Sequence, residues 1–168
     1  MKLGNNILAF ILFVVIGIPV YILFLPIIIV LIPIQYFQRK QFEKKYSDFL
    51  TEISGKNFFC YNNRKNSRKY IEDEIIPNLK DGIEIVYLNE KKVESEYNKE
   101  FISEALYKLK KYSGFPHLMK MRNGKLIDKS INNLFYNVLN LNKPKNELLT
   151  KINRFFELTE IKTLPNNL

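Results

Sequence analysis

The chain has 168 residues, a formal net charge of +9 at pH 7, one cysteine and one histidine. A single cysteine excludes an internal disulfide and fits a reducing compartment, and a single histidine argues against a zinc cluster. The positive charge suits an anionic membrane leaflet, nucleic acid or an acidic protein equally well, and no motif specifically indicates nucleic acid, a metal or a cofactor.

An uncharged apolar stretch from Ile7 to Ile34 dominates the start of the chain. Its length of about 28 residues exceeds the ~18 that indicate a membrane helix, and Tyr36 and Phe37 follow it where an interfacial aromatic belt is expected. As a helix it measures about 42 Å, against a hydrocarbon core of about 30 Å. We therefore expect a membrane anchor over residues 1–37, either a bowed single span or a re-entrant hairpin.

Three prolines bear on the form of this anchor. Pro19, Pro26 and Pro33 recur every seven residues, so they lie on nearly one helical face and their kinks add. The spacing does not choose between span and hairpin. A cleaved signal peptide is not expected, because the apolar run is about twice the usual ~7–15 residues and no small-x-small cleavage site follows.

Charges on either side of the apolar run predict its orientation. Only Lys2 precedes the run, whereas four cations follow it within eleven positions of Ile34. These four are Arg39, Lys40, Lys44 and Lys45. The excess of Lys and Arg after the anchor predicts a chain in the cell membrane with its C-terminal domain in the cytoplasm, for span and hairpin alike.

The remaining part, of about 130 residues, is long enough for one domain with its own core. Phe42, Tyr46, Phe49 and Leu50 recur at helical spacing, which predicts an amphipathic linker helix over 38–55 that ends at Gly55. We expect the domain itself over residues 56–160 and a disordered tail over 161–168.

Within the domain, apolar periodicity and turn residues predict the order strand, helix, strand, helix, strand, strand, helix. The expected positions are 57–61, 67–79, 83–88, 97–112, 116–122, from 125, and from about 145. Ser67 is the predicted N-cap of the first helix, Gly114 the end of the second, and Asn123-Gly124 the turn of a hairpin. Residues 131–142 fit no single class.

This order predicts an α/β domain in which helices cover both faces of a mixed sheet. It resembles the thioredoxin fold over residues 57–158. Three short motifs carry the resemblance: Gly114-Phe115-Pro116 before the third strand, Arg122-Asn123-Gly124-Lys125 at the hairpin, and Pro144-Lys145-Asn146-Glu147-Leu148 at the last helix. The resemblance implies a cis peptide bond between Phe115 and Pro116.

The redox motif of that family, CxxC between the first strand and the first helix, is missing here. Alignment on Phe58-Phe59 places Arg64 and Ser67 at the two cysteine positions and leaves Cys60 inside the strand. Thiol–disulfide exchange requires an accessible thiolate. We therefore expect Cys60 to be a buried core residue, with a catalytic thiol as the alternative.

Cations occupy the place of the redox motif. Arg64, Lys65, Arg68 and Lys69 surround a predicted helix N-terminus, whose N–H groups and dipole favour anions. Their mutual repulsion suggests that a phosphate, carboxylate or acidic peptide binds there, and that reversing Arg64 and Arg68 to Glu leaves the domain as stable or more so. The alternative is a solvated basic loop.

Ser67 and the segment Phe115-Pro116-His117 complete the candidate site, because the thioredoxin family holds extended peptides at the edge beside its cis-proline. His117 either lines such a groove or is structural, since no acid or nucleophile accompanies it in the sequence.

Two classes of function follow. The first is a membrane-anchored, redox-inactive thioredoxin-like module that binds an unknown protein or anionic ligand at the cytoplasmic membrane face. The second is a membrane-associated enzyme, either a monothiol redox protein using Cys60 or a transferase whose anionic substrate meets residues 64–69. The absence of a catalytic pair in the sequence favours the binding module.

Overall fold

The computed structural model describes residues 10, 12–111 and 114–157, which form an N-terminal unit up to Lys45 and a globular unit from Tyr46. The predicted tail over 161–168 and the predicted helix end at residue 112 lie outside the described residues.

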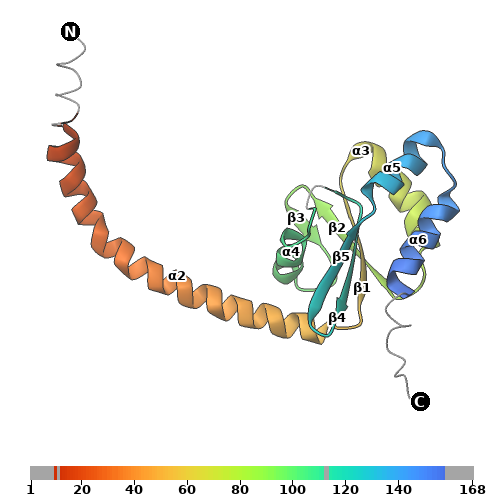
Figure 1. The fold of residues 1–168 in the computed structure, drawn as a ribbon, viewed down its shortest axis with the longest axis horizontal. Coiled ribbons are helices and arrows are strands. Elements are labelled where there is room, and N and C mark those ends of the chain that lie inside the picture. The colour runs from red at the N-terminus through yellow and green to blue at the C-terminus, as the bar shows by residue number, and fades with distance from the viewer. Residues whose placement is uncertain (1–9, 11, 112–113, 158–168) are drawn as a thin grey trace, which may run out of the picture. The chain divides into compact units, whose positions relative to one another are not determined.

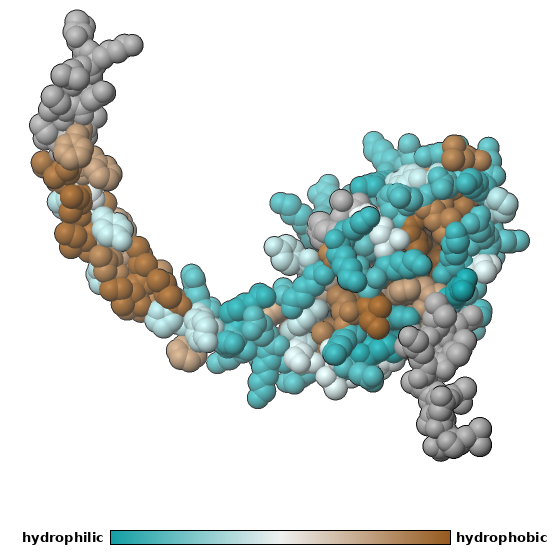
Figure 2. Space-filling model, in the orientation of Figure 1, coloured by the Kyte–Doolittle hydropathy of each residue, from teal (hydrophilic) through white to brown (hydrophobic). Residues whose placement is uncertain are grey.

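A single long helix makes up most of the N-terminal unit. A π-helical turn, Phe13–Gly17, leads into helix α2, Ile18–Glu52, which continues through Pro26 and Pro33. Figure 1 shows the apolar part of α2 as curved and unbroken, and Figure 2 shows mostly apolar residues along it, with a few paler ones among them, before polar residues follow. The helix is long and apolar enough to cross a bilayer.

No break separates the predicted anchor from the predicted linker helix. Residues 35–52 include many Gln, Lys, Arg, Glu and Leu residues, which are good helix formers, so α2 runs on to Glu52. Gly55 follows with φ of 96°, a conformation that favours glycine. At this end of the helix Tyr46, Phe49 and Leu50 are buried, as the helical spacing predicts.

The globular unit is built on one five-stranded mixed sheet with the strand order β3-β2-β1-β4-β5. The strands are β1, Asn57–Asn62; β2, Ile83–Asn89; β3, Lys92–Glu94; β4, His117–Arg122; and β5, Lys125–Ser130. β1 is parallel to β2, and every other pair is antiparallel. The Asn123-Gly124 turn joins β4 to β5 with φ of 51° and 67°, as expected for this dipeptide.

Helices lie on both sides of this sheet. They are α3, Lys65–Tyr70, extended by a π turn, Ile71–Ile75, and a 3-10 turn, Ile76–Asn78; α4, Lys99–Tyr107; α5, Asn132–Leu141; and α6, Lys145–Glu157. In Figure 1, α4 lies on one side of the strands, and α3, α5 and α6 lie on the other. The chain is therefore an α/β protein with a long apolar N-terminal helix.

The alternation of side chains along β1 gives the domain a core on each face of the sheet. Phe59 and Tyr61 pack into a cluster with residues of α5 and α6. Phe58 faces the other way, where its ring lies 5.3 Å from that of Tyr97, and the Phe49 ring of α2 lies 5.1 Å from Phe101 of α4. The continuous apolar run of β1 thus reflects a strand that is covered on both faces.

The first helix begins earlier than predicted, and Ser67 is not its N-cap. Arg64 occupies the N-cap position with extended φ and ψ of −60° and 118°, without a side-chain hydrogen bond to the helix. Ser67 lies within the first turn, where its hydroxyl donates to the Arg64 carbonyl at 3.1 Å. A serine hydroxyl near the start of a helix can either accept from a free N–H as an N-cap or donate to a nearby carbonyl. The sequence pattern does not distinguish these two roles.

The second helix, α4, ends at Tyr107, short of the end predicted for residue 112, just before Gly114. The N–H of Lys110 donates to Asp128 Oδ2 at 3.4 Å, and the carbonyl oxygen of Lys111 lies 2.6 Å from His117 Nε2. Contacts with β4 and β5 therefore hold this part of the chain, and they override the helical periodicity of the sequence.

Two elements were not predicted as such. Strand β3 has three residues of which only Val93 is buried, so it is too short to show an alternating pattern. The ambiguous residues 131–142 contain helix α5, which ends at Asn142 in a left-handed conformation.

Candidate functional site

The four cations lie where β1 leads into α3. Asn62 ends the strand, Lys65 begins the helix, and the N–H of Asn63 donates to the carbonyl of Leu88 at the end of β2 at 3.2 Å. This bond holds the connecting loop at the carboxyl ends of the two parallel strands. The side chains of Arg64, Lys65, Arg68 and Lys69 are all exposed.

Arg68 is not a free cation. Its Nε donates to Glu72 Oε1 at 2.9 Å, and its guanidinium carbon lies 4.8 Å from the centroid of the Tyr87 ring. Glu72 also accepts from the Tyr61 hydroxyl at 3.0 Å. Glu72 therefore partly compensates the charge of Arg68, which weakens the expected repulsion among the four cations.

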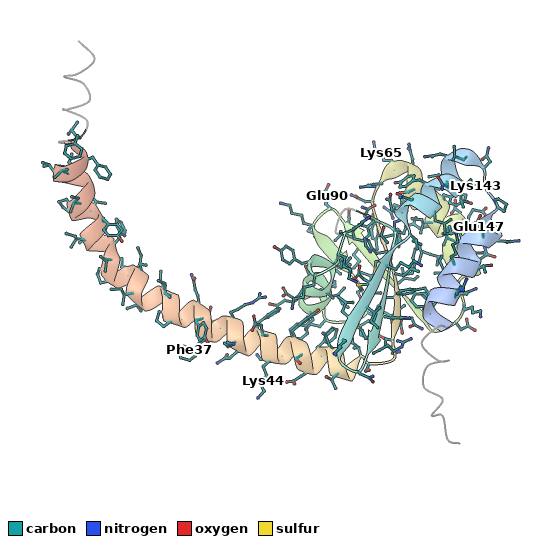
Figure 3. All side chains as sticks on the ribbon, in the orientation of Figure 1. Phe37, Lys44, Lys65, Glu90, Lys143 and Glu147 are labelled. Carbon is teal, nitrogen blue, oxygen red and sulfur yellow. The ribbon has the colours of Figure 1, made fainter. Side chains whose placement is uncertain are left out.

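Lys65 and Lys69 are the freer members of the group. Within the described part of the chain, neither side chain forms an ion pair or a hydrogen bond. Figure 3 shows Lys65 at the outer end of α3, pointing away from the domain. A ligand can approach these two ammonium groups without breaking a contact within the described residues.

The segment Phe115-Pro116-His117 does not line an open groove. The Phe115-Pro116 peptide bond is cis, which confirms the prediction, but all three residues are buried. The Phe115 carbonyl accepts from Asn132 Nδ2 at 2.5 Å, and the Pro116 carbonyl accepts from the N–H of Ile131 at 3.0 Å. The start of α5 thus covers the edge at which the resemblance places an extended peptide.

His117 is structural. Its side chain is 0 % exposed, and because a carbonyl can only accept, the Nε2–H donates to Lys111 O. Nδ1 has no hydrogen-bond partner among the described residues and lies 3.9 Å from Asp128 Oδ2. Burial lowers the pKa of the imidazole, and the Lys111 carbonyl and Asp128 only partly oppose that shift.

Ser67 and Cys60 are also inside the domain. Ser67 is buried against the Arg64 carbonyl, and Cys60 is 0 % exposed in the middle of β1, opposite His117 of β4. Burial alone raises the pKa of the Cys60 thiol, so neither a neighbouring cation nor a helix terminus activates it. Of the eight candidate residues, only the four cations reach the surface.

Sequence reasoning missed the partners of these residues. Glu72 lies four positions after Arg68, a spacing at which helical ion pairs form, so this signal was readable in the sequence. Tyr87 and Asn132 come from distant parts of the chain, and only the fold places them against Arg68 and Phe115.

Together these features define an α/β domain with a buried thiol, an exposed cationic end of its central parallel strands, and a long apolar helix before it. Among the described residues, no group of His, Cys, Asp and Glu side chains is placed to hold a metal ion. No protein-family model matches the chain, and no curated protein or solved structure matches it.

Proposed function

We propose that this chain is a membrane-anchored, redox-inactive binding module whose domain lies in the cytoplasm and meets an anionic partner with Arg64, Lys65, Arg68 and Lys69. The observation that carries the proposal is that cations, and not a thiol, lie at the exposed end of β1. Exposed cations lie at the carboxyl end of β1, while Cys60, the one thiol of the chain, is buried inside that strand.

The proposal includes a thioredoxin-like fold for the domain. What supports it is the strand order β2-β1-β4-β5, in which the first two strands are parallel and the hairpin is antiparallel, with a helix in each predicted connection. In that fold the end of β1 is the functional edge. At this edge the chain has cations in the place of the redox cysteines. Such a surface is suited to bind phosphate, carboxylate or acidic side chains.

The charge distribution around the apolar helix supports a cytoplasmic domain, since the cations follow the helix rather than precede it. The domain carries most of the excess positive charge of the chain, which suits an anionic partner at the inner membrane face. The enzymatic alternatives have less support, because Cys60 is buried and His117, the one histidine, is buried away from solvent.

Site-specific photo-crosslinking in cells tests the proposal. A photoreactive residue at Lys69 is placed on the exposed face of α3, and a matched one at Lys99 lies at the start of α4 on the other side of the sheet. We expect adducts from position 69 that disappear when Arg64 and Lys65 are changed to Glu. Adducts that form equally from position 99, or that persist after the charge reversal, contradict the proposal.

Cys60 supplies the test of the redox alternative. If Cys60→Ser folds normally but loses the cellular function of the protein, while Lys65→Glu with Lys69→Glu has no effect, the redox interpretation replaces the binding module.

A further inference from the structure

The part of α2 that follows the apolar stretch carries its charges on distinct helical ridges. Because residues four apart are neighbours on a helix, positions 35–45 form three ridges of three residues, beside the pair Gln38-Phe42. They are Gln35-Arg39-Glu43, Tyr36-Lys40-Lys44 and Phe37-Gln41-Lys45. The three ridges differ in net charge, which gives this segment distinct faces.

The ridge with Arg39 is neutral. Arg39 Nε donates to Glu43 Oε1 at 3.1 Å, and the guanidinium carbon lies 5.6 Å from the centroid of the Phe42 ring. Arg39 therefore extends along the helix away from the apolar stretch. Its charge is compensated by Glu43, the one acidic residue of positions 35–45.

The Tyr36-Lys40-Lys44 ridge, unlike the ridge with Arg39, carries a net positive charge. Lys40 Nζ lies 5.8 Å from the centroid of the Tyr36 ring, so this side chain reaches back toward the apolar stretch, the direction in which helical side chains tilt. Neither Lys40 nor Lys44 forms an ion pair within the described residues, and Figure 3 shows Lys44 pointing away from the helix. This ridge carries two uncompensated positive charges beside an aromatic ring.

The position of these charges matches the headgroup layer of a bilayer. Lys40 is six residues after Ile34, or about 9 Å along the helix, and its side chain reaches back by about one turn. The polar layer of one leaflet is about 5–8 Å thick. An ammonium group at this depth meets lipid phosphates, and Lys44, one turn further, lies within about one Debye length of them.

We propose that the Tyr36-Lys40-Lys44 ridge binds the headgroups of anionic phospholipids, with Lys40 as the principal contact. Lys40 and Lys44 supply the charge, and Tyr36 holds Lys40 toward the bilayer while its own ring lies at the interface. This inference rests on the membrane anchor of the proposed function, but not on the ligand of the domain.

Spin-label spectroscopy of the full chain in phosphatidylcholine vesicles tests this inference. Vesicles carry a trace of spin-labelled phosphatidylserine or of spin-labelled phosphatidylcholine, and the motionally restricted fraction reports the lipid held by the protein. We expect the native chain to hold phosphatidylserine in preference. Lys40→Gln and Lys44→Gln should each lower that preference, by up to about fivefold per lysine, with the larger loss for Lys40.

The double change Arg39→Gln with Glu43→Gln is the matched control, because it removes two charged groups from the same segment without changing its net charge. It should keep the native preference. Lys65→Glu with Lys69→Glu, which disables the proposed site of the domain, should also keep it. The experiment can therefore contradict the lipid-binding ridge without contradicting the anionic site of the domain.

An unchanged preference in the Lys40→Gln Lys44→Gln protein overturns the inference, as does an equal loss in the Arg39→Gln Glu43→Gln control. A chain that does not float with the vesicles overturns it together with the membrane anchor.

Discussion

Arg68 and Glu72 form an ion pair one helical turn apart, with 2.9 Å between Nε and Oε1. The side-chain hydrogen bond with Glu72 raises the pKa of Arg68, and the face of Tyr87 packs against the guanidinium. The pair links α3 to the π turn that follows, while the ring belongs to β2. Arg68 thus contributes to the structure of the domain as well as to its cationic surface.

Arg68→Glu should therefore lower the unfolding temperature of the domain, which reverses the expectation from the sequence alone. The new carboxylate faces Glu72 and loses the contact with the Tyr87 ring. Lys69→Glu, on the same helix but without an ion pair among the described residues, is the control and should change the unfolding temperature less. Thermal unfolding followed by circular dichroism measures both, and equal shifts would contradict a specific role for the Arg68–Glu72 pair.

Cys60 should react with a thiol reagent only when the domain unfolds. It is 0 % exposed, and burial raises the pKa of its thiol, so little thiolate forms near neutral pH. A Ser103→Cys, Cys60→Ala protein places a thiol on the exposed side of α4 and should react at once. Rapid labelling of native Cys60 would show that the strand opens or that the thiol is activated.

Substitution of Cys60 separates its packing from its chemistry. Cys60→Ser places a hydroxyl in an apolar site between β2 and β4 and should lower the free energy of unfolding by about 1–3 kcal/mol. Cys60→Ala should be milder, because it adds no polar group. Urea unfolding gives both values, and a larger loss for alanine than for serine would contradict an apolar surrounding.

The sequence predicted the elements that carry a local signal. Asn123-Gly124 predicted the hairpin turn, the apolar run of 57–61 predicted the strand that became β1, and the last helix, expected from about residue 145, begins at Lys145. Each of these depends on turn chemistry or periodicity within a few residues, which is the information that a single sequence carries most directly.

The sequence did not predict what depends on distant contacts. The residue types of Phe115, Pro116 and His117 do not by themselves show whether these residues are buried or exposed. Their burial follows from the packing of the start of α5 against them. Lys120 shows the same limit: a lysine is expected in solvent, yet it is 6 % exposed and its Nζ donates to the Phe155 carbonyl at 2.6 Å. Only the fold brings the end of α6 to β4.

Reporter fusions test the proposed membrane anchor and its orientation. Because Arg39, Lys40, Lys44 and Lys45 follow the apolar helix, a reporter fused after Leu168 should behave as cytoplasmic. The same reporter at the N-terminus should be outside for a single span and inside for a re-entrant hairpin. Activity of the C-terminal fusion outside the cell would contradict the positive-inside prediction, whichever result the N-terminal fusion gives.

His117 should make the stability of the domain depend on pH in the acidic range. Its pKa in the folded protein is lowered from 6.5, chiefly by burial, whereas the unfolded chain keeps the ordinary value. The unfolded state then binds a proton more readily, so the contribution of the neutral imidazole is complete above pH 6.5 and is lost as the pH falls through the folded pKa. Each unit of difference between the two pKa values corresponds to about 1.4 kcal/mol.

His117→Gln isolates this contribution, because glutamine keeps an N–H donor for the Lys111 carbonyl but does not titrate. The free energy of unfolding, measured by urea titration at a series of pH values from neutral to mildly acidic, should fall more steeply for the native chain than for the variant. Carboxylates titrate in both proteins, so the difference between the two curves belongs to residue 117. Parallel curves would mean that the pKa of the imidazole is the same in the folded and unfolded states, in which case the Lys111 carbonyl and Asp128, 3.9 Å from Nδ1, offset the burial of the ring.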